Sequence, residues 1–403
     1  MAVTDERAAY VALALVPGIG PARLTELLTH CHTALGALSA PFEFLGTVPG
    51  ISRAAATAIS AATPAAGEAL LAQVEAMGAH ALLPADPDFP SMLREIPDPP
   101  ALLFAVGDLS LLTRPAVAIV GSRDHSTYGG AVCRMIAEAA AGAGVVVVSG
   151  MARGLDAIAH RAALDVGGAT IGVLGNGLGV IYPAANRELY GAVERDGLLL
   201  TEFPPGERPG VGAFPRRNRL ISGLARVTVV IEAATASGTL ITVGTALSQG
   251  RDVMAVPGNI TSATSVGTNR LVQDGAEPLI ELGDLLRHYP EAGAASGHAI
   301  ASLTPTATRS HTGERWNNPP TATQSPTLDP PKLPADLPDA ERRVAEALKA
   351  GPAPVDLLVL RSGLPTSLAL SALSMLEFRG LILQDGGVVR WDIEGEGQRA
   401  RLK

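Results

Sequence analysis

Lysine is almost absent from this chain of 403 residues, and the shortage removes several kinds of active site. It occurs only at Lys332, Lys349 and Lys403, so everything before Lys332 takes its positive charge from arginine. A phosphate-binding lysine of the Walker type, a Schiff-base lysine and a lysine general base are therefore excluded from that part. Arginine binds phosphate differently, through parallel N–H donors in a fixed fork.

Cysteine is also scarce, with Cys31 and Cys133 alone and no CxxC spacing. A disulfide framework and a zinc ribbon are both excluded. The triplet His30-Cys31-His32 does not predict a metal site, because adjacent helical residues point in different directions and no fourth ligand is evident. We expect no metal and no cofactor.

Long apolar runs and a strong net charge are missing too. No segment reaches the ~18 uninterrupted apolar residues of a membrane span. The N-terminal segment MAVTDERAAY carries early acids where a signal peptide has an apolar core. These features predict a cytoplasmic protein with no membrane partner. The net charge of −8 argues against non-specific coating of nucleic acid and leaves room for a local basic site.

The hydrophobic content is high, at 47%, although aromatic residues make up only 3%. Cores packed from small and aliphatic side chains are therefore expected. At about 150 residues per domain, the length predicts two or three domains.

Residues 80–290 alternate apolar strand candidates with helical segments. Near-continuous apolar strands of this kind are typical of a parallel sheet covered on both faces. We predict an α/β fold, an extended Rossmann-like doubly wound parallel sheet whose ligand lies at the carboxyl ends of the strands. The candidate strands are Leu102 to Val106, Val117 to Val120, Val145 to Ser149, Thr170 to Leu174, Leu198 to Thr201, Val227 to Glu232 and Val253 to Val256.

Residues 1–79 read as short helices interrupted at two apolar-Pro-Gly-Ile-small hairpins, at 16–20 and 48–52. The pattern resembles the helix-hairpin-helix or SAM-like module, in which N–H groups of the second helix can hold a DNA phosphate. The second copy has Ser52 where the motif prefers glycine, and acids outnumber arginines here. Packing or partner docking is therefore favoured over auxiliary contact with nucleic acid.

The C-terminal third begins with residues 291–337, rich in Ala, Ser, Thr and Pro, which predict a disordered linker. Trp316 is its one large apolar residue, either a docking point or an unstructured side chain. Residues 338–392 then predict a winged helix, a helix-turn-helix followed by two strands. Its recognition helix offers only Arg379 as a cation, so a protein-interaction role is favoured over DNA reading.

Two strand-to-helix turns carry the features of an anion site. Each follows an apolar strand and combines small residues, which expose backbone N–H groups, with an arginine. The first turn is Gly121, Ser122 and Arg123, and the second contains Ser149, Gly150, Arg153 and Gly154. Asp156 and His160 follow in the next helix, where a capping or other structural role is favoured over metal binding or acid–base work.

Two further segments complete the predicted pocket. Five arginines face two glutamates between Thr201 and Arg226, so a locally positive surface exists despite the acidic total. In the first segment Arg217, Asn218 and Arg219 can bind phosphate and Phe214 can stack on a base; in the second, Ser237, Gly238 and Thr239 can add hydroxyls and amides. The chain lacks a G-x-G-x-x-G fingerprint, a Walker A motif and a G-x-S-x-G elbow, which disfavours oxidoreductases and NTPases.

Seven motifs in order closely resemble the DNA-processing protein A family, also called DprA/Smf, over roughly residues 80–285. Met151 departs from the Leu or Ile usual there, which is a conservative change. The motifs are VGSR at 120–123, SGMARGLDAIAH at 149–160, TIGVLGNGLGVIYPAAN at 170–186, TEFPPG at 201–206, FPRRNRLISGLA at 214–225, EAATASGTLIT at 232–242 and VPGNITSATSVGTN at 256–269.

The resemblance implies a non-catalytic protein that binds single-stranded DNA through its Rossmann-like domain. It also implies a homodimer formed through that domain and loading of the RecA recombinase during natural transformation. Carried over to this chain, Ser122 and Arg123 match a first phosphate site and Arg153 a second, while 217–219 match the family's Arg-Asn-Arg element.

The alternative is a nucleotide phosphoribohydrolase of the lysine-decarboxylase-like type, whose related sheet also binds phosphate. Such enzymes resemble one another in a PGGxGTxxE turn that ends in a catalytic glutamate. Here Thr242 stands where that glutamate would be.

Overall fold

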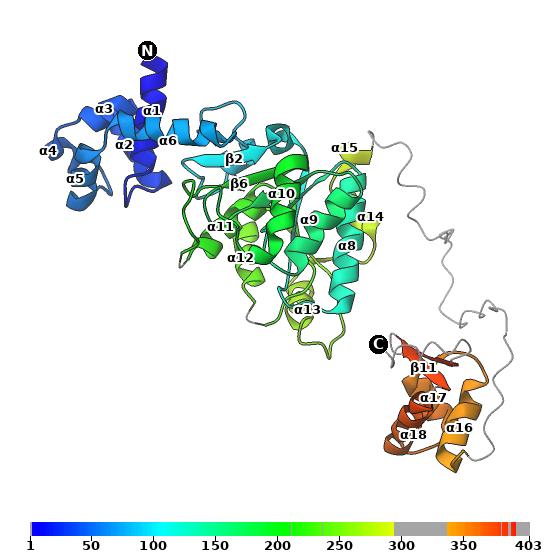
Figure 1. Cartoon of the computed structure of the whole chain (residues 1–403). Helices are drawn as coiled ribbons and strands as arrows, with labels where there is room; N and C mark the ends of the chain where they lie inside the picture. The colour runs from blue at the N-terminus through cyan, green and yellow to red at the C-terminus, as the bar shows by residue number, and fades with distance from the viewer. Residues whose placement is uncertain are drawn as a thin grey trace. The chain divides into compact units, whose positions relative to one another are not determined.

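The computed structural model describes residues 2–210, 212–235, 237–293, 337–379, 381–385 and 388–391 (Figure 1). The chain divides into two units, Met1–Thr308 and Arg309–Lys403. The predicted linker and Trp316 lie almost entirely outside the described residues.

A nine-stranded sheet forms the centre of the first unit, with the order β1-β2-β6-β5-β4-β3-β7-β8-β9 in the described residues. The strands from β6 to β9 in this order are parallel, whereas β1 and β2 are antiparallel at one edge. Their bounds are β1 His80–Leu82, β2 Leu103–Gly107, β3 Ala116–Val120, β4 Val146–Ser149, β5 Thr170–Val173, β6 Leu198–Thr201, β7 Val227–Val230, β8 Asp252–Ala255 and β9 Glu277–Pro278.

The seven strands predicted from the sequence are all present, and the α/β fold class is confirmed. The sheet is parallel as predicted except at one edge, where β2 pairs with β1 and β6 in antiparallel register. The short edge strands β1 and β9 were missed; two or three residues are too few to show a periodic pattern.

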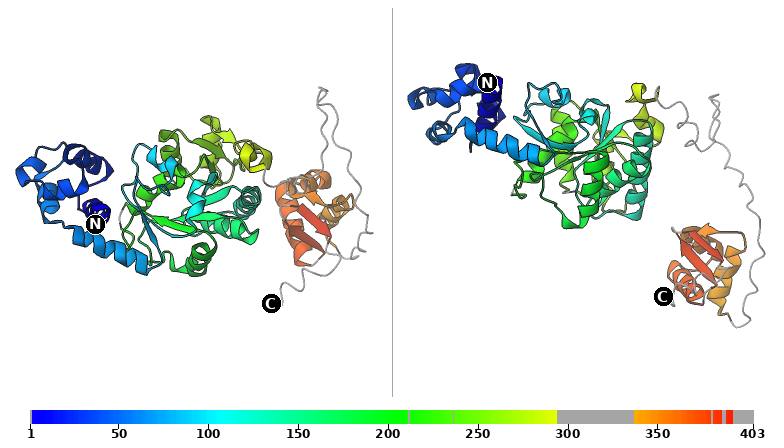
Figure 2. Two further views of the ribbon diagram at one scale, coloured as in Figure 1. Left: turned by 90° about the horizontal axis from the view of Figure 1, so that it is seen from above. Right: turned by 45° about the horizontal axis from the view of Figure 1, so that its top comes forward.

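Helices cover both faces of this sheet, which explains the near-continuous apolar strands (Figure 2). One face packs against α8 Thr127–Gly142, α9 Leu155–Asp165, α10 Arg187–Asp196 and α14 Leu282–Leu286. The other face packs against α7 Ser91–Arg94, α11 Ala213–Gly223 and α12 Thr239–Ser248. The remaining elements are α13 Val266–Gln273, α15 Pro290–Gly293 and the 3₁₀ helices η1 Leu109–Thr113 and η2 Ala184–Asn186.

The sheet has a topological switch point between β3 and β7. From β3 the chain adds β4, β5 and β6 on one side, and then returns to add β7, β8 and β9 on the other. The loops that leave β3 and β7 therefore part in opposite directions and open a crevice at the carboxyl edge, where ligands of such sheets bind.

The N-terminal helices enclose a small core of their own, formed mainly by alanine and leucine. The two hairpins join α1 to α2 and α4 to α5, and both have a glycine with positive φ, Gly18 at 83° and Gly50 at 78°. Arg7 binds Asp86 at 2.8 Å and ties these helices to the start of the α/β region. The helices are α1 Ala2–Ala14, α2 Pro21–Cys31, α3 Ala34–Ser39, α4 Phe42–Leu45, α5 Arg53–Ala61 and α6 Pro64–Ala76.

The second unit contains the predicted winged helix. A three-stranded sheet of order β10-β12-β11 packs with three helices around an apolar core. Arg379, which caps the recognition helix α18, forms an ion pair with Glu341 at 3.0 Å. The elements are α16 Asp339–Leu348, β10 Ala353–Pro354, α17 Val355–Ser362, α18 Thr366–Phe378, β11 Ile382–Asp385 and β12 Val388–Trp391.

Candidate nucleic-acid interface

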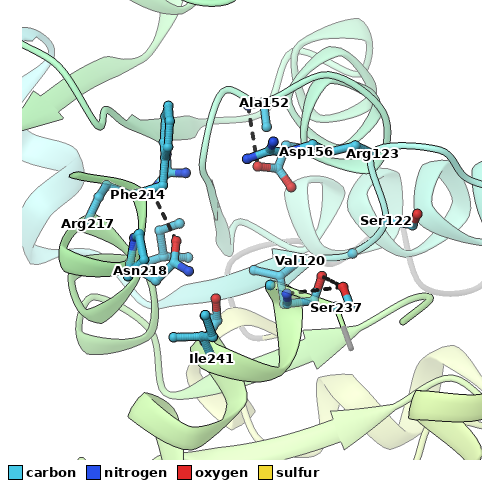
Figure 3. Close-up of a pocket in the computed structure, with 16 residues that line it drawn as sticks. Val120, Ser122, Arg123, Ala152, Asp156, Phe214, Arg217, Asn218, Ser237 and Ile241 are labelled. Carbon is cyan, nitrogen blue, oxygen red and sulfur yellow. Dashed lines mark hydrogen bonds between the residues drawn. The ribbon is translucent and has the colours of Figure 1, made fainter. Parts of the chain in front are cut away.

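A pocket of about 400 Å³ lies in the crevice at the switch point (Figure 3). Its walls come from the turn after β3, the start of α9, one side of α11 and the start of α12. Four segments that are distant in sequence thus meet at one sheet edge. The predicted site residues that line it are Gly121, Ser122, Arg123, Phe214, Arg217, Asn218, Ser237, Gly238 and Thr239.

Two guanidinium groups and an aromatic ring form the centre of this pocket. The guanidinium carbon of Arg123 lies 5.7 Å from the centre of the Phe214 ring, and that of Arg217 lies 5.9 Å from it. Both distances are within the range of a cation–π interaction. The arrangement places two phosphate-binding groups beside a surface on which a base can stack.

Arg217 is buried, with an exposed fraction of 4%. Its Nη1 donates hydrogen bonds to the carbonyl oxygens of Gly150 and, at 2.6 Å, Val173. Burial lowers the pKa of Arg217, and the nearby Asp156 carboxylate opposes that shift. The side chain is therefore held in one position, with its charge incompletely compensated by the protein.

Asp156 also lines the pocket and is the one carboxylate among its described lining residues. Burial raises the pKa of Asp156, while the charge of Arg217, the amide of Ala152 and the charge of Arg123 act in the opposite direction. Figure 3 shows its carboxylate on the side of the pocket opposite Asn218. A negative group at this position opposes an anionic ligand, whereas sequence reasoning favoured a structural role for it.

The second turn shapes the pocket through its glycines. A side chain at Gly150 would place its Cβ 2.7 Å from both Arg217 Nη1 and Asp156 Oδ2. Gly154 has a φ of 81°, and its Cβ would lie 2.5 Å from the backbone oxygen of Arg123. Only glycine lets the two βα turns approach this closely.

A smaller cavity of about 70 Å³ adjoins the first and shares Arg123, Phe214 and Arg217 with it. It is lined on its outer side by Arg153 and Tyr182. The Tyr182 and Phe214 rings lie 5.6 Å apart. Arg153 is exposed and forms an ion pair of 3.2 Å with Asp124, so its guanidinium stands at the entrance.

Known proteins share both parts of this structure. The family model described as DNA recombination-mediator protein A matches residues 80–290, and the model of the DprA winged helix domain matches residues 328–387. The chain belongs to the DNA recombination-mediator protein A family. It is accordingly a DNA-processing recombination mediator, and the winged helix is a domain found in that family.

Individual members of the family resemble the chain over much of its length. Protein Smf of Synechocystis is 33% identical over 95% of this chain and 98% of its own length. DNA processing protein DprA of Streptococcus pneumoniae is 45% identical over 51% of this chain and 72% of its own. The X-ray structure of the Streptococcus pneumoniae protein superposes with a TM-score of 0.59, at 33% identity, over 71% of this chain and 96% of that one.

Five of the predicted site residues do not line the main pocket. Gly150 and Arg153 line the smaller cavity beside it, whereas Ser149, Gly154 and Arg219 line neither. Arg219 is 8% exposed and binds Glu202 at 2.6 Å and Asp98 at 3.1 Å. Ser149 is fully buried, and its hydroxyl donates to the carbonyl oxygen of Ile119 at 2.7 Å. Positions 217 and 219 are two apart on a helix and so point in different directions, a signal that the sequence already contained.

Glu232 is the glutamate in the same segment as Thr242, where the phosphoribohydrolase alternative requires a catalytic glutamate, and its contacts are structural. Its carboxylate accepts hydrogen bonds from the Ser126 amide at 2.9 Å and from the Thr264 hydroxyl at 3.0 Å, and it is 1% exposed. It thereby holds the start of α8 against the end of β7. A carboxylate engaged in this way gives no support to the phosphoribohydrolase alternative.

His160 also lies beneath the site rather than in it. It is fully buried, its Nδ1 pairs with the Thr170 hydroxyl at 2.6 Å, and burial lowers its pKa to about 3. Among the described residues, no cluster of three His, Cys, Asp or Glu side chains could hold a metal ion. No helix in the described part of the chain is both long and apolar enough to cross a bilayer.

Proposed function

We propose that the pocket at the switch point binds the backbone of single-stranded DNA, with Arg123 and Arg217 on phosphates and Phe214 beneath a base. The observation that supports this is the grouping of two guanidiniums around one aromatic ring in a cavity of about 400 Å³. Arg–phosphate contacts combined with aromatic stacking are the common recognition mode for single strands.

The preference for a single strand follows from access to the base. In a duplex the base faces are covered by their neighbours in the stack, whereas a single strand can turn a base onto the Phe214 ring. Asn218 lies beside the ring and can donate a hydrogen bond to a phosphate or a base edge. The contacts are to backbone and ring faces, so little sequence preference is expected.

Binding of oligo(dT) at several salt concentrations tests the proposal, with Arg123→Ala as the main variant. A charge-assisted hydrogen bond contributes about 1.5–3 kcal/mol, so the affinity should fall roughly ten- to a hundredfold. Because one phosphate contact is lost, the slope of log K against log salt should become shallower by about 0.7.

Arg195→Ala is the matched control for that experiment. Arg195 is exposed on α10, next to the amino end of β6, and pairs with Asp196 at 2.8 Å. It removes the same charge from the opposite edge of the sheet, so affinity and salt slope should stay close to those of the unaltered protein. Equal losses in the two variants, or no binding of oligo(dT) by the unaltered protein, would overturn the proposed function.

We further propose that the pocket binds DNA without cleaving it. In the described lining of the main pocket, Asp156 stands without a histidine or a second carboxylate that could share acid–base work. Incubation of the protein with labelled oligo(dT) and with nucleoside monophosphates should release neither shortened strands nor free base.

We also propose that the protein acts as a homodimer in the cytoplasm and passes the bound strand to RecA. Large exposed apolar side chains on the α/β region, Leu247, Ile260 and Ile280, offer the kind of surface that a subunit interface covers. Light scattering should give twice the mass of the chain, and RecA filaments should form faster on strands that carry the protein. A monomeric mass or unchanged filament growth would contradict these two assignments separately.

A further inference from the structure

A second and larger cavity lies at the same edge of the sheet, on the side of β8. It is an open hollow of about 670 Å³, bordered by the start of α8, the end of β7 and the loop 257–265. Its lining includes the aromatic ring of Tyr128, the amide of Asn259 and the hydroxyls of Ser126 and Ser262. The function proposed above makes no use of this cavity.

Tyr128 is the outstanding feature of this second cavity. Half of its side chain is exposed, yet its hydroxyl donates a hydrogen bond of 2.9 Å to the carbonyl oxygen of Pro257. The bond joins α8 to the loop after β8 and fixes the ring in one orientation. An exposed ring that is already immobilised loses little conformational entropy when a planar group stacks on it.

The charges around the second cavity disfavour a phosphate and suit an uncharged group. Its described lining contains no arginine or lysine, and the buried carboxylate of Glu232 lies at its inner wall. Phosphate would therefore meet a negative charge without a compensating cation. A nucleobase carries no charge at neutral pH and can turn one face to the Tyr128 ring and its polar edge to the Asn259 amide.

The second cavity lies next to the main pocket, on the other side of Glu232. Glu232 forms the wall between the two: its backbone lies against Gly121 of the main pocket, and its carboxylate lies against Gly129 at the start of α8. The segment 122–128 leads along the sheet edge from Arg123 to Tyr128. A strand whose phosphate is held by Arg123 can thus extend over this segment into the second cavity.

We propose that Tyr128 is a second stacking platform, which binds a base of the same DNA strand farther along the backbone than the base on Phe214. The proposal rests on the proposed function of the main pocket. According to this proposal, the arginines at the switch point hold phosphates, and Tyr128 holds a base in the second cavity, whose described lining contains no arginine or lysine.

Affinity for oligo(dT) of increasing length tests this assignment, with Tyr128→Ala compared with Tyr128→Phe. The shortest oligomers that bind should have the same affinity for Tyr128→Ala as for the unaltered protein, because they fill only the main pocket. Longer oligomers should bind Tyr128→Ala about tenfold more weakly, since one stacked base is lost. Tyr128→Phe keeps the ring and should bind long oligomers nearly as well as the unaltered protein.

The salt dependence separates stacking from phosphate binding. Tyr128→Ala should leave the slope of log K against log salt unchanged, whereas Arg123→Ala should make it shallower. Tyr128→Leu keeps a branched apolar side chain without a ring and guards against a loss due to misfolding; it should behave like Tyr128→Ala.

The possible results distinguish the two proposals. If Arg123→Ala weakens binding and Tyr128→Ala has full affinity at every length, the second platform is wrong and the main pocket stands. A loss in Tyr128→Phe equal to that in Tyr128→Ala would also overturn it, because the hydrogen bond rather than the ring would then matter. Absence of oligo(dT) binding by the unaltered protein would overturn the main pocket itself.

Discussion

The two sides of α11 use the same residue type for opposite purposes. On the pocket side, Arg217 points at the space beside Phe214 and keeps part of its charge available. On the other side, Arg219 is neutralised by Glu202 at 2.6 Å and by Asp98 at 3.1 Å. Arg216 also binds Glu202, at 2.8 Å, from a half-exposed position.

This contrast shows that a cluster of arginines in a sequence is not a measure of a positive surface. Of the three arginines in the run from 216 to 219, the structure presents only Arg217 to the pocket. The pairs with Glu202 hold α11 against the end of β6, and that attachment orients Phe214 and Asn218. One side of α11 lines the pocket, and the other side attaches the helix to the sheet.

Replacing Arg217 should have the largest effect. Arg217→Ala removes a phosphate contact and leaves Asp156 buried without its nearest opposite charge, so oligo(dT) affinity should fall about a hundredfold and stability by about 3 kcal/mol. Arg217→Lys keeps the charge without the fork and should bind with intermediate affinity. Fluorescence anisotropy measures the affinity of each variant, and urea unfolding measures its stability. Full affinity in Arg217→Ala would contradict the proposed difference between Arg217 and Arg219.

Replacing Arg219 should affect folding rather than binding. Arg219→Ala breaks a buried ion pair and leaves Glu202 with Arg216 alone, which should cost about 3 kcal/mol of unfolding free energy. Below the denaturation temperature, oligo(dT) affinity should stay within about threefold of the original value, well short of the change for a lost phosphate contact. A tenfold or larger loss of affinity at full stability would place Arg219 on the DNA after all.

Replacing Asp156 should strengthen binding. Asp156→Asn removes a negative charge from the pocket, and the affinity for oligo(dT) should rise by about three- to tenfold at low salt. Glu207→Gln provides a control, because it removes a charge outside the described lining of this pocket. An unchanged or reduced affinity in Asp156→Asn alone would show that its support of Arg217 outweighs its repulsion of phosphate.

The same carboxylate predicts a pH dependence. Burial raises the pKa of Asp156 above its ordinary value, so it takes up a proton earlier as the pH falls and its repulsion of phosphate disappears. Affinity should therefore increase as the pH falls through this raised pKa, and Asp156→Asn should abolish the increase. His160 stays uncharged in this pH range, since its pKa is lowered to about 3. The exposed His125, two residues after Arg123, is replaced by His125→Gln both in the unaltered protein and in Asp156→Asn, so that it does not contribute to the pH dependence.

Replacing Arg216 should have the smallest effect. Its guanidinium is half exposed, so its ion pair with Glu202 contributes about 0.5 kcal/mol after screening by solvent. Arg216→Ala should lower the melting temperature slightly and leave both the affinity and the salt slope unchanged. A shallower salt slope would mean that Arg216 leaves Glu202 to bind a phosphate, and the division between the two sides of α11 would no longer hold.

Most of the fold was accessible from the sequence because strand and helix periodicities are local. All seven strands predicted for the large sheet were found within about two residues of their observed ends, as expected where boundaries are the least certain feature. The two-residue strand β10 of the winged helix was missed. The antiparallel pairing of β1 and β2 was not predicted, since strand direction depends on which strands meet rather than on the residues of either one.

Much of the candidate site could also be predicted from the sequence, because its turns directly follow recognisable strands. Gly121 to Arg123 and Gly150 to Gly154 follow strand ends, and parallel strands bring their carboxyl ends to one edge. Asp156 and Tyr128 were not recognised as parts of this edge, because nothing in their own segments indicates that they face a cavity. Their positions depend on contacts with Arg217 and Pro257, far away in the chain.

The sequence by itself therefore determined the type of fold, the edge of the sheet where the site lies and the use of arginine in place of lysine. Only the tertiary structure decided which arginines remain available to a ligand. A guanidinium has a fixed charge, but its free energy of binding depends on whether a carboxylate already compensates it. Glu202 lies beside Arg219 rather than Arg217 because β6 and α11 meet on that side of the helix.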